Sequence, residues 1–329
     1  MKFYLLTFRL ENINMQTIKV ALAQIAPVWF NREATLDKVI SYMEEAAQEN
    51  CDLVAFGEAL VPGYPFWLER TGAAKFNDDL QKTVQAEYSK QAVQIERGDL
   101  DRVCQAAKTH QISIYLGIIE RPVDRSGHSL YCSLVYINQE GSIQSVHRKL
   151  MPTYEERLSW SPGDGHGLVT HKLGDFTIGG LNCWENWMPL ARATLYAQGE
   201  DLHIASWPGN LANTFDLTPV IAKEGRSYVM SVSGLMRPAD VSKAIPQLEH
   251  LSESSDAFFA DGGSCIANPD GTWLIEPQTE KEGLFVAELD HQFVLKERQN
   301  FDPAGHYSRP DVTCLSVDRT RQSTVIFKD

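Results

Sequence analysis

The sequence predicts an α/β protein in which apolar strands form two sheets and helices cover them from outside. Short apolar runs of strand length alternate with longer segments that have helical periodicity. No linker-like tract and no repeat of 20–50 residues interrupts this alternation in the 329-residue chain. We therefore expect a single domain over 15–300, preceded by an appendage at 1–14 and followed by a C-terminal arm at 301–329.

The first half of the chain opens with a strand and a helix. Residues 18–25 form an apolar run of strand length, and 32–49 place their apolar residues at helical spacing. A second apolar strand, 52–57, is followed directly by Glu58. The pattern then predicts, in order, a helical region over 73–97, a helix over 99–110, a strand over 112–120, and a hairpin that pairs 133–138 with 142–149.

The second half repeats this alternation. A strand over 176–182 precedes a helix over 189–198, which has Pro189 in its first turn and Gly199 past its end. Residues 236–260 are polar and show no clear period, so we expect a surface loop there. The remaining apolar runs predict strands over 202–207 and 228–233, a hairpin of 264–268 with 273–276, and a last strand over 284–289.

Composition and charge exclude several classes of protein. Hydrophobic residues make up 43% and charged residues 22%, as in an ordinary globular protein rather than a disordered chain. The net charge is −13, which argues against nucleic acid or a membrane as the main partner, because both attract clustered positive charge. No apolar run is long enough to span a bilayer, and the stretch 3–8 is too short for a signal peptide.

The cysteines indicate a reducing compartment. The six lie far apart in the sequence, at 51, 104, 132, 183, 265 and 314. This spacing fits neither a disulfide framework nor a zinc motif, so we expect no metal. Because no targeting segment is present either, we expect a cytoplasmic protein.

Three predicted strand ends carry reactive side chains, namely Glu58, Lys149 and Cys183. Cys183 lies at a strand-to-helix turn, where backbone N–H groups favour a thiolate. A carboxylate, an ammonium group and a thiol can serve as base, charge stabiliser and nucleophile. Each also has an ordinary structural interpretation, because Glu58 can cap a turn, Lys149 can be a solvated strand end and Cys183 can be a buried small hydrophobe.

The sequence around these residues resembles the nitrilase superfamily of carbon–nitrogen hydrolases, which use a Glu–Lys–Cys triad in this chain order. The resemblance extends over 18–315 and implies Glu58 as general base, Lys149 as charge stabiliser and Cys183 as nucleophile. It also implies a four-layer α-β-β-α sandwich without a cofactor, and an arm that packs across a homodimer or larger homo-oligomer. The matching stretches are 52–58 with 62–65, 147–153 and 180–186.

Within that superfamily, the resemblance is closest to the branch of true nitrilases, because Trp184 and Glu185 follow Cys183. Glu156 then falls on the second glutamate of the family site, with Glu155 beside it as the alternative. Residues of the matching loops are candidates for substrate binding: Tyr64, Thr153, Trp160, Trp184 and Trp207.

The resemblance implies hydrolysis of an organic nitrile to its carboxylic acid and ammonia, through a thioimidate and a thioester on Cys183. An amidase or carbamoyl hydrolase with the same triad is the first alternative, and a relative that hydrates nitriles or acts on cyanide is the second. Further alternatives are a Cys–His dyad with His147 or His203, a non-catalytic relative and a redox-sensing thiol protein. The size and chemistry of the nitrile stay open.

Overall fold

The computed structural model describes residues 17–243, 245–325 and 328, so the appendage predicted at 1–14 lies outside the described residues. The first of its two sheets runs in the order β13–β1–β2–β3–β4–β5. Its central strands β1, β2 and β3 are parallel, and the outer ones are antiparallel to their neighbours. The bounds are β1 Thr17–Gln24, β2 Leu53–Phe56, β3 Ser113–Glu120, β4 Tyr131–Ile137, β5 Ile143–Arg148 and β13 Gly283–Asp290.

The second sheet runs in the order β10–β11–β9–β8–β7–β6, and β12 pairs with β11 beside this path. It has the same plan, because β7, β8 and β9 are parallel and lie between antiparallel strands. The bounds are β6 His171–Leu173, β7 Phe176–Asn182, β8 Leu202–Trp207, β9 Tyr228–Ser233, β10 Leu235–Met236, β11 Ala260–Ala267 and β12 Trp273–Thr279.

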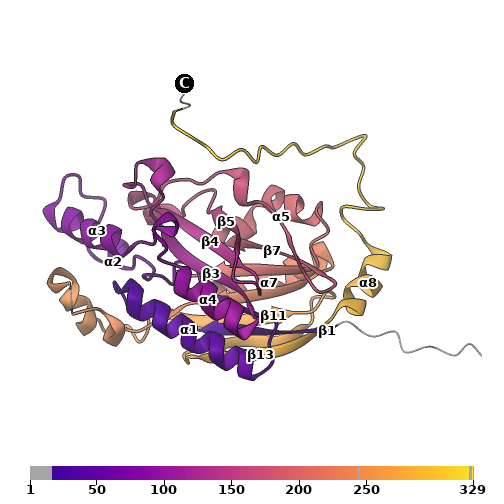
Figure 1. Cartoon of the computed structure of the whole chain (residues 1–329), viewed down its shortest axis with the longest axis horizontal. Helices are drawn as coiled ribbons and strands as arrows, with labels where there is room; N and C mark the ends of the chain where they lie inside the picture. Colours follow the sequence, from indigo (N-terminus) through magenta and orange to yellow (C-terminus); the bar gives the residue numbers. More distant parts are fainter. Residues whose placement is uncertain (1–16, 244, 326–327, 329) are drawn as a thin grey trace, which may run out of the picture.

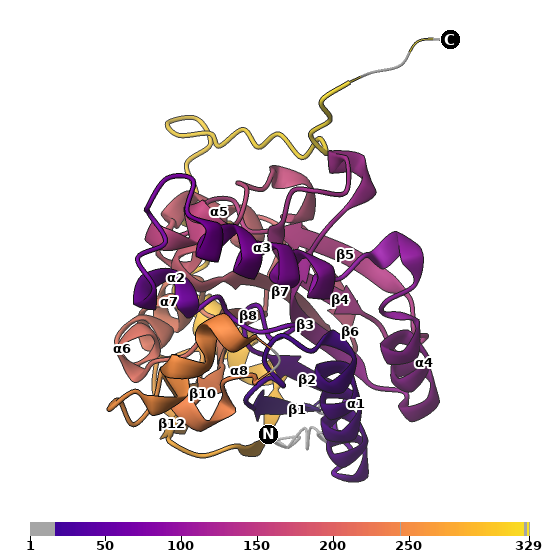
Figure 2. The same ribbon diagram turned by 90° about the vertical axis from the view of Figure 1, so that its left-hand side faces the viewer.

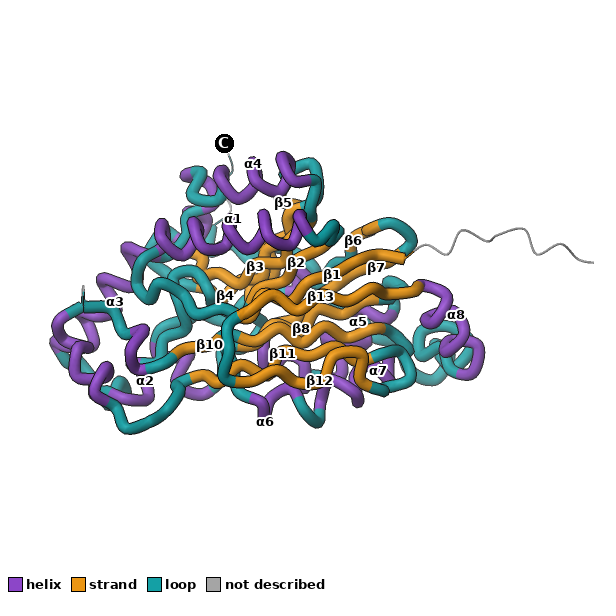
Figure 3. The backbone as a smooth tube through the Cα atoms, turned by 90° about the horizontal axis from the view of Figure 1, so that it is seen from below, coloured by secondary structure: helices purple, strands orange, loops and turns teal. Residues whose placement is uncertain are grey.

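Helices cover the outer faces of both sheets. In Figures 2 and 3, α1 and α4 lie on one side of the strands and α6 and α7 lie on the other. The bounds are α1 Arg32–Gln48, α2 Trp67–Arg70, α3 Asp79–Gln91, α4 Asp101–His110, α5 Pro189–Tyr196, α6 Leu211–Thr214, α7 Leu217–Gly225 and α8 His291–Asn300.

Apolar interfaces hold these layers in the order α-β-β-α. Val39 of α1 belongs to a buried cluster with the outer face of the first sheet. Leu22 of β1 and Ile204 of β8 belong to the cluster between the two sheets. Ile221 of α7 packs on the outer face of the second sheet. The four-layer sandwich expected from the sequence is therefore the observed architecture.

Strand β1 explains why the central strands are continuous apolar runs in the sequence. Its residues Val20 and Leu22 face the second sheet, whereas Ala21 and Ala23 face the helical layer of α1. Successive side chains of a strand point to opposite faces, and here both faces are covered. Every position from Val20 to Gln24 is therefore buried, and regular alternation with polar residues is absent there.

The two sheets come into backbone contact at Gly57, directly after β2. A Cβ atom added to Gly57 would lie 2.7 Å from the backbone nitrogen of Gly234. The next residue, Glu58, donates its backbone N–H to the carbonyl of Trp207 at the end of β8, over 3.0 Å. A larger residue at position 57 would push the sheets apart, so glycine is needed to hold Glu58 against the second sheet.

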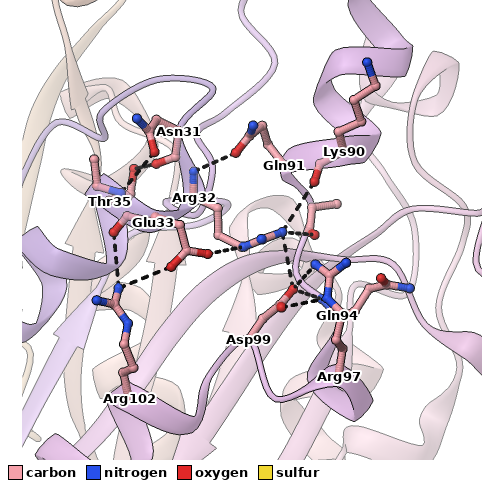
Figure 4. A network of polar contacts seen from close by, with 12 residues as sticks. Asn31, Arg32, Glu33, Thr35, Lys90, Gln91, Gln94, Arg97, Asp99 and Arg102 are labelled. Atoms are coloured by element: carbon pink, nitrogen blue, oxygen red, sulfur yellow. Dashed lines mark hydrogen bonds and ion pairs between the residues drawn. The ribbon is translucent and has the colours of Figure 1, made fainter.

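A polar network fixes the start of α1 against the segment that follows α3 (Figure 4). The Arg32 backbone N–H donates to the Gln91 side chain over 3.0 Å, and the Arg32 guanidinium lies 3.3 Å from the Asp99 carboxylate. Asp99 also accepts from the side chain of Arg97 and from the backbone N–H of Gln94. The network ties the start of α1 to the end of α3 and to the segment between α3 and α4.

Several expectations from the sequence differ from the structure. The helical region expected over 73–97 contains the shorter helix α3, because the polar residues before it form turns. The expectation of a surface loop over 236–260 was wrong. This segment begins with part of β10 and includes a 3₁₀ helix at Pro246–Glu253. Leu248 and Leu251 of this 3₁₀ helix are buried against an aromatic cluster that includes Trp67. Helices α7 and α8 were not predicted.

The C-terminal arm leaves α8 and crosses the molecule past α5 without helix or strand in its described residues (Figure 1). Near its end, the Arg321 guanidinium donates to the Asp164 carboxylate over 3.0 Å and to the carbonyl of Val146 in β5 over 3.0 Å. The arm is therefore anchored to the loop beside the first sheet. Among the described residues, no helix has the length and hydropathy needed to cross a membrane.

Candidate active site

The three strand ends singled out in the sequence meet in one buried cluster. Glu58 follows β2, Lys149 follows β5, and Cys183 follows β7 of the second sheet. All three side chains are almost completely buried. The cluster therefore lies where the two sheets face each other, and its residues come from both.

Lys149 is the centre of the cluster. Its Nζ lies 2.7 Å from Oε1 of Glu58 and 2.7 Å from Oε2 of Glu156. An ammonium group between two carboxylates, all shielded from water, is an electrostatic arrangement that a merely structural strand end does not need.

Glu156 is held by groups from two directions. It is the third residue of the 3₁₀ helix Tyr154–Leu158, and its Oε2 accepts from the backbone N–H of Thr153 over 2.6 Å. Its Oε1 accepts from the hydroxyl of Tyr64 over 2.8 Å. Glu155, the neighbouring alternative, is partly exposed. The geometry thus places Glu156 at the lysine.

Cys183 opens the turn after β7. Its backbone adopts φ of 49°, in the left-handed region that side chains other than glycine rarely occupy. Its Sγ and one carboxylate oxygen from each of Glu58 and Glu156 all lie within 4.8 Å of one another. This set could ligate a divalent ion by its donor types, but the Lys149 ammonium already supplies a positive charge to both carboxylates.

The electrostatics differ from what the sequence led us to expect for the thiol. Burial raises the pKa of Cys183 well above its usual value, and Glu58 raises it further, whereas Lys149 and the backbone N–H of Trp184 lower it. The expectation that Lys149 and the turn would favour a resting thiolate is therefore corrected, since desolvation outweighs both. The sulfur carries its proton until a base removes it.

Glu58 is suited to remove that proton. Burial raises its pKa from 4.5 to about 7, because desolvation outweighs the attraction of Lys149. The pKa of Lys149 is raised well above its usual value, since the surrounding Cys183, Glu58 and Glu156 favour its charged form more strongly than burial opposes it. The site therefore combines a base that titrates near neutrality with a lysine that stays charged.

The five candidate substrate-binding residues lie in different surroundings. The rings of Tyr64 and Trp160 meet edge to face at 5.6 Å, and Trp160 lies 5.6 Å from Lys149 Nζ. Trp207 is fully buried in the cluster behind Cys183, and its indole N–H donates to Ser231. Thr153 is partly buried, whereas the Trp184 side chain is 54% exposed. Tyr64 and Trp160 are thus the aromatic residues beside the lysine.

Two further residues at the site were not among the catalytic or binding candidates chosen from the sequence. Cys132 of β4 lies with its Sγ 3.3 Å from Oε1 of Glu58. Glu185, two residues after Cys183, accepts hydrogen bonds from the backbone N–H groups of Leu150 and Asn182 over 2.5 and 2.8 Å. A capping signal, Asn182 followed by a glutamate three residues later, could have indicated the Glu185 contact. No local signal indicates Cys132.

The two histidines considered as partners for a Cys–His dyad bond to other groups. His147 Nε2 lies 3.0 Å from Oε2 of Glu185. His203 lies between Glu200 and Asn186, with Nε2 2.7 Å from the amide oxygen of Asn186. Both are therefore part of the support behind the cysteine turn.

Comparison with known proteins finds one family and relatives that are named nitrilases. The model of the carbon-nitrogen hydrolase family matches residues 19–297. The chain is 35% identical to nitrilase 2 from an unknown prokaryotic organism, over 95% of this chain and 96% of that protein. It is 36% identical to an aliphatic nitrilase of Rhodococcus rhodochrous, over 94% of this chain and 81% of that protein.

A solved structure extends the likeness to the fold. The carbon-nitrogen hydrolase from Helicobacter pylori G27 superposes with a TM-score of 0.68 at 19% identity, over 90% of this chain and 97% of that one. At this identity the likeness concerns the fold alone. It confirms the α/β architecture of two sheets flanked by helices.

Proposed function

The chain belongs to the carbon–nitrogen hydrolase family, and we propose that it is a nitrilase in which Glu58, Lys149 and Cys183 perform the reaction. The observation that carries the assignment of residues is the Lys149 ammonium, held 2.7 Å from both Glu58 and Glu156 beside the Cys183 thiol. The relatives named as nitrilases support the choice of nitrile over amide.

The first half of the reaction makes a covalent intermediate. Glu58 accepts the proton of the Cys183 thiol while the sulfur forms a bond to the nitrile carbon and one C–N π bond breaks. The nitrogen gains the electron pair, and Lys149 stabilises its negative charge until the proton held by Glu58 is transferred to it. The product of this half is a thioimidate on Cys183.

The second half releases both products. Glu58 activates a water molecule, which adds to the thioimidate carbon, and the C–N bond breaks as ammonia leaves. A thioester remains on Cys183. A second water adds in the same way, the C–S bond breaks, and the carboxylic acid and the Cys183 thiol are released. Two waters are consumed for each nitrile.

The test is to incubate the purified protein with a nitrile and, separately, with its amide, and to measure ammonia and acid. We expect ammonia and acid from the nitrile, and a loss of about 10³-fold or more in Cys183→Ala, because the nucleophile is gone. Cys51→Ala, which removes another buried thiol at the far end of β2, is the control. Rapid amide turnover with an inert nitrile would instead identify an amidase.

Two properties beyond the reaction belong to this proposal. We propose that the protein works in a reducing compartment, the cytoplasm, which is supported by six cysteines that are all free, including the nucleophile. We also propose a homodimer or a larger homo-oligomer. Its support is a group of exposed apolar side chains on the turn after Cys183, the start of α5 and the arm: Trp187, Met188, Leu190, Tyr307 and Leu315.

A further inference from the structure

Cys132 lies beside the general base in a way that the reaction so far does not use. Its Sγ is 3.3 Å from Oε1 of Glu58, and both side chains are buried. Burial raises the pKa of the Cys132 thiol well above its usual value, and the charge of Glu58 raises it further. The thiol therefore keeps its proton, and it is the donor in this contact.

The two oxygens of Glu58 are in different situations. Oε1 accepts from Cys132 and lies 2.7 Å from Lys149 Nζ. Oε2 is buried and has no hydrogen-bond partner within the described part of the chain. A buried carboxylate oxygen without a partner is costly, and such groups are found where chemistry needs them. The carboxylate is thus held through one oxygen, and the other is left to accept a proton.

We propose that Cys132 is a positioning residue, whose thiol holds Oε1 of Glu58 so that Oε2 is free to accept the proton of Cys183 and of the attacking water. This inference rests on the proposed function, because it gives Glu58 the role of base. A carboxylate held by the lysine alone could rotate about its Cγ–Cδ bond and turn its second oxygen away from the proton it must accept. The second donor, which approaches from β4, removes that freedom.

A thiol suits this role better than a stronger donor. The hydrogen bond from Cys132 lowers the pKa of Glu58, in opposition to the effect of burial. Because S–H is a weak donor, it orients the carboxylate while taking little from its basicity. A charged donor at the same place would hold the carboxylate ionised and would weaken it as a base.

The experiment compares variants with and without a donor at position 132. Cys132→Ala and Cys132→Val remove the donor, Cys132→Ser keeps one, and Cys51→Ala is the control for loss of a buried thiol. In the donor-free variants we expect the acid limb of the kcat/KM profile to shift to higher pH by about half a unit, because Glu58 loses a hydrogen bond that lowers its pKa. We also expect the plateau value of kcat/KM to fall about tenfold. The control should keep the acid limb of the parent protein, and the serine variant, whose O–H is a stronger donor, should move it to lower pH rather than higher.

A second measurement does not depend on the substrate. The rate at which iodoacetamide alkylates Cys183, followed by mass spectrometry of the peptide that contains it as a function of pH, should show the same displacement in the donor-free variants. If the parent protein hydrolyses no nitrile, the proposed function fails but the alkylation series still decides the role of Cys132. If alanine and valine variants with normal thermal unfolding keep the parent's acid limb, the positioning role is overturned. If alanine prevents folding, the valine variant decides.

Discussion

At the scale of single residues, the site is defined by an excess of negative charge around one lysine. Glu58 and Glu156 share the Lys149 ammonium, and all three are buried. In water, hydration would stabilise the negative charge of both carboxylates. Burial removes this hydration, and the desolvation raises the pKa of Glu58 to about 7. A glutamate that would be a weak base in water is thereby made an effective one at neutral pH.

This titration predicts the pH dependence of activity. Only the ionised form of Glu58 can accept a proton, and a pKa of about 7 means that this form is lost as the pH falls below that value. We expect kcat/KM to be level above neutrality and to decrease about tenfold per pH unit below it. The measurement is the initial rate of ammonia release at low substrate, from about pH 5 to about pH 9.

The control for the pH profile is Glu58→Gln, which cannot ionise. It should lower kcat/KM by about 10²–10⁴-fold and leave no acid limb near neutrality in the residual rate. A parent profile that stays flat down to pH values near the ordinary pKa of a glutamate would show that Glu58 is not the titrating base.

At the scale of elements, one carboxylate connects the two segments that carry Lys149 and Cys183. Glu185, in the 3₁₀ helix Cys183–Trp187, accepts from the backbone N–H of Leu150 and from His147, on either side of the lysine. It also accepts from the backbone N–H of Asn182, next to the cysteine. These bonds hold the pKa of Glu185 below its usual value although burial opposes this. The first and second sheets are thus joined at the site.

We therefore expect Glu185→Gln to reduce activity, because it loosens the connection that sets the distance between Lys149 and Cys183. The amide keeps the shape of the side chain, but it loses the charge and one of the two accepting oxygens. Because small displacements of reacting groups are costly, we expect kcat to fall about 10²-fold. Steady-state kinetics and urea unfolding, measured on the same preparation, check this expectation.

Asp201→Asn provides the matched control for Glu185. Asp201 is also buried and accepts from a backbone N–H, that of Thr177 over 2.9 Å, but at the opposite end of β7 from Cys183. We expect it to cost stability, about 1–3 kcal/mol, with little change in kcat. A similar fall of kcat in both variants would indicate a general loss of structure rather than a specific connection.

At the scale of the whole molecule, exposed apolar side chains gather where α5 and the arm face each other. A groove between them is lined by Leu190 of α5 and by Tyr307 and Leu315 of the arm. Leu190 and Tyr307 are 65% and 60% exposed, and large apolar side chains gathered on one surface are typical of protein interfaces. This surface begins at the turn after Cys183, so the proposed assembly contact and the proposed catalytic cysteine are adjacent in the chain.

We expect Leu190→Glu to weaken the proposed homo-oligomer, because it buries a charge in an apolar contact. The parent protein should sediment as a dimer or a larger species in analytical ultracentrifugation, and the variant should shift toward the monomer. Val123→Glu introduces the same charge at an exposed valine in the 3₁₀ helix Val123–Arg125 and should have no effect. A parent protein that sediments as a monomer would contradict the proposal.

Much of the fold could be predicted from the sequence because its signals are local. Strands such as β7, β8 and β9 are largely apolar runs of strand length, and their bounds were predicted correctly. The segment 236–260 was misread as a loop because its buried apolar residues, which include Ile245, Leu248 and Leu251, are separated by polar ones. Short 3₁₀ turns owe their structure to tertiary packing, which a periodic pattern does not record.

The sequence by itself determined the class of the fold and the identity of the reactive groups, because apolar periodicity and motifs are properties of neighbouring residues. Only the tertiary structure decided that Glu58, Lys149 and Cys183 share one buried site, with Glu156 and Cys132 in contact with them. It also decided their protonation, since desolvation depends on every layer that covers the site. Distances across two sheets and the exclusion of water are set by the packing of the whole chain, and no local pattern records them.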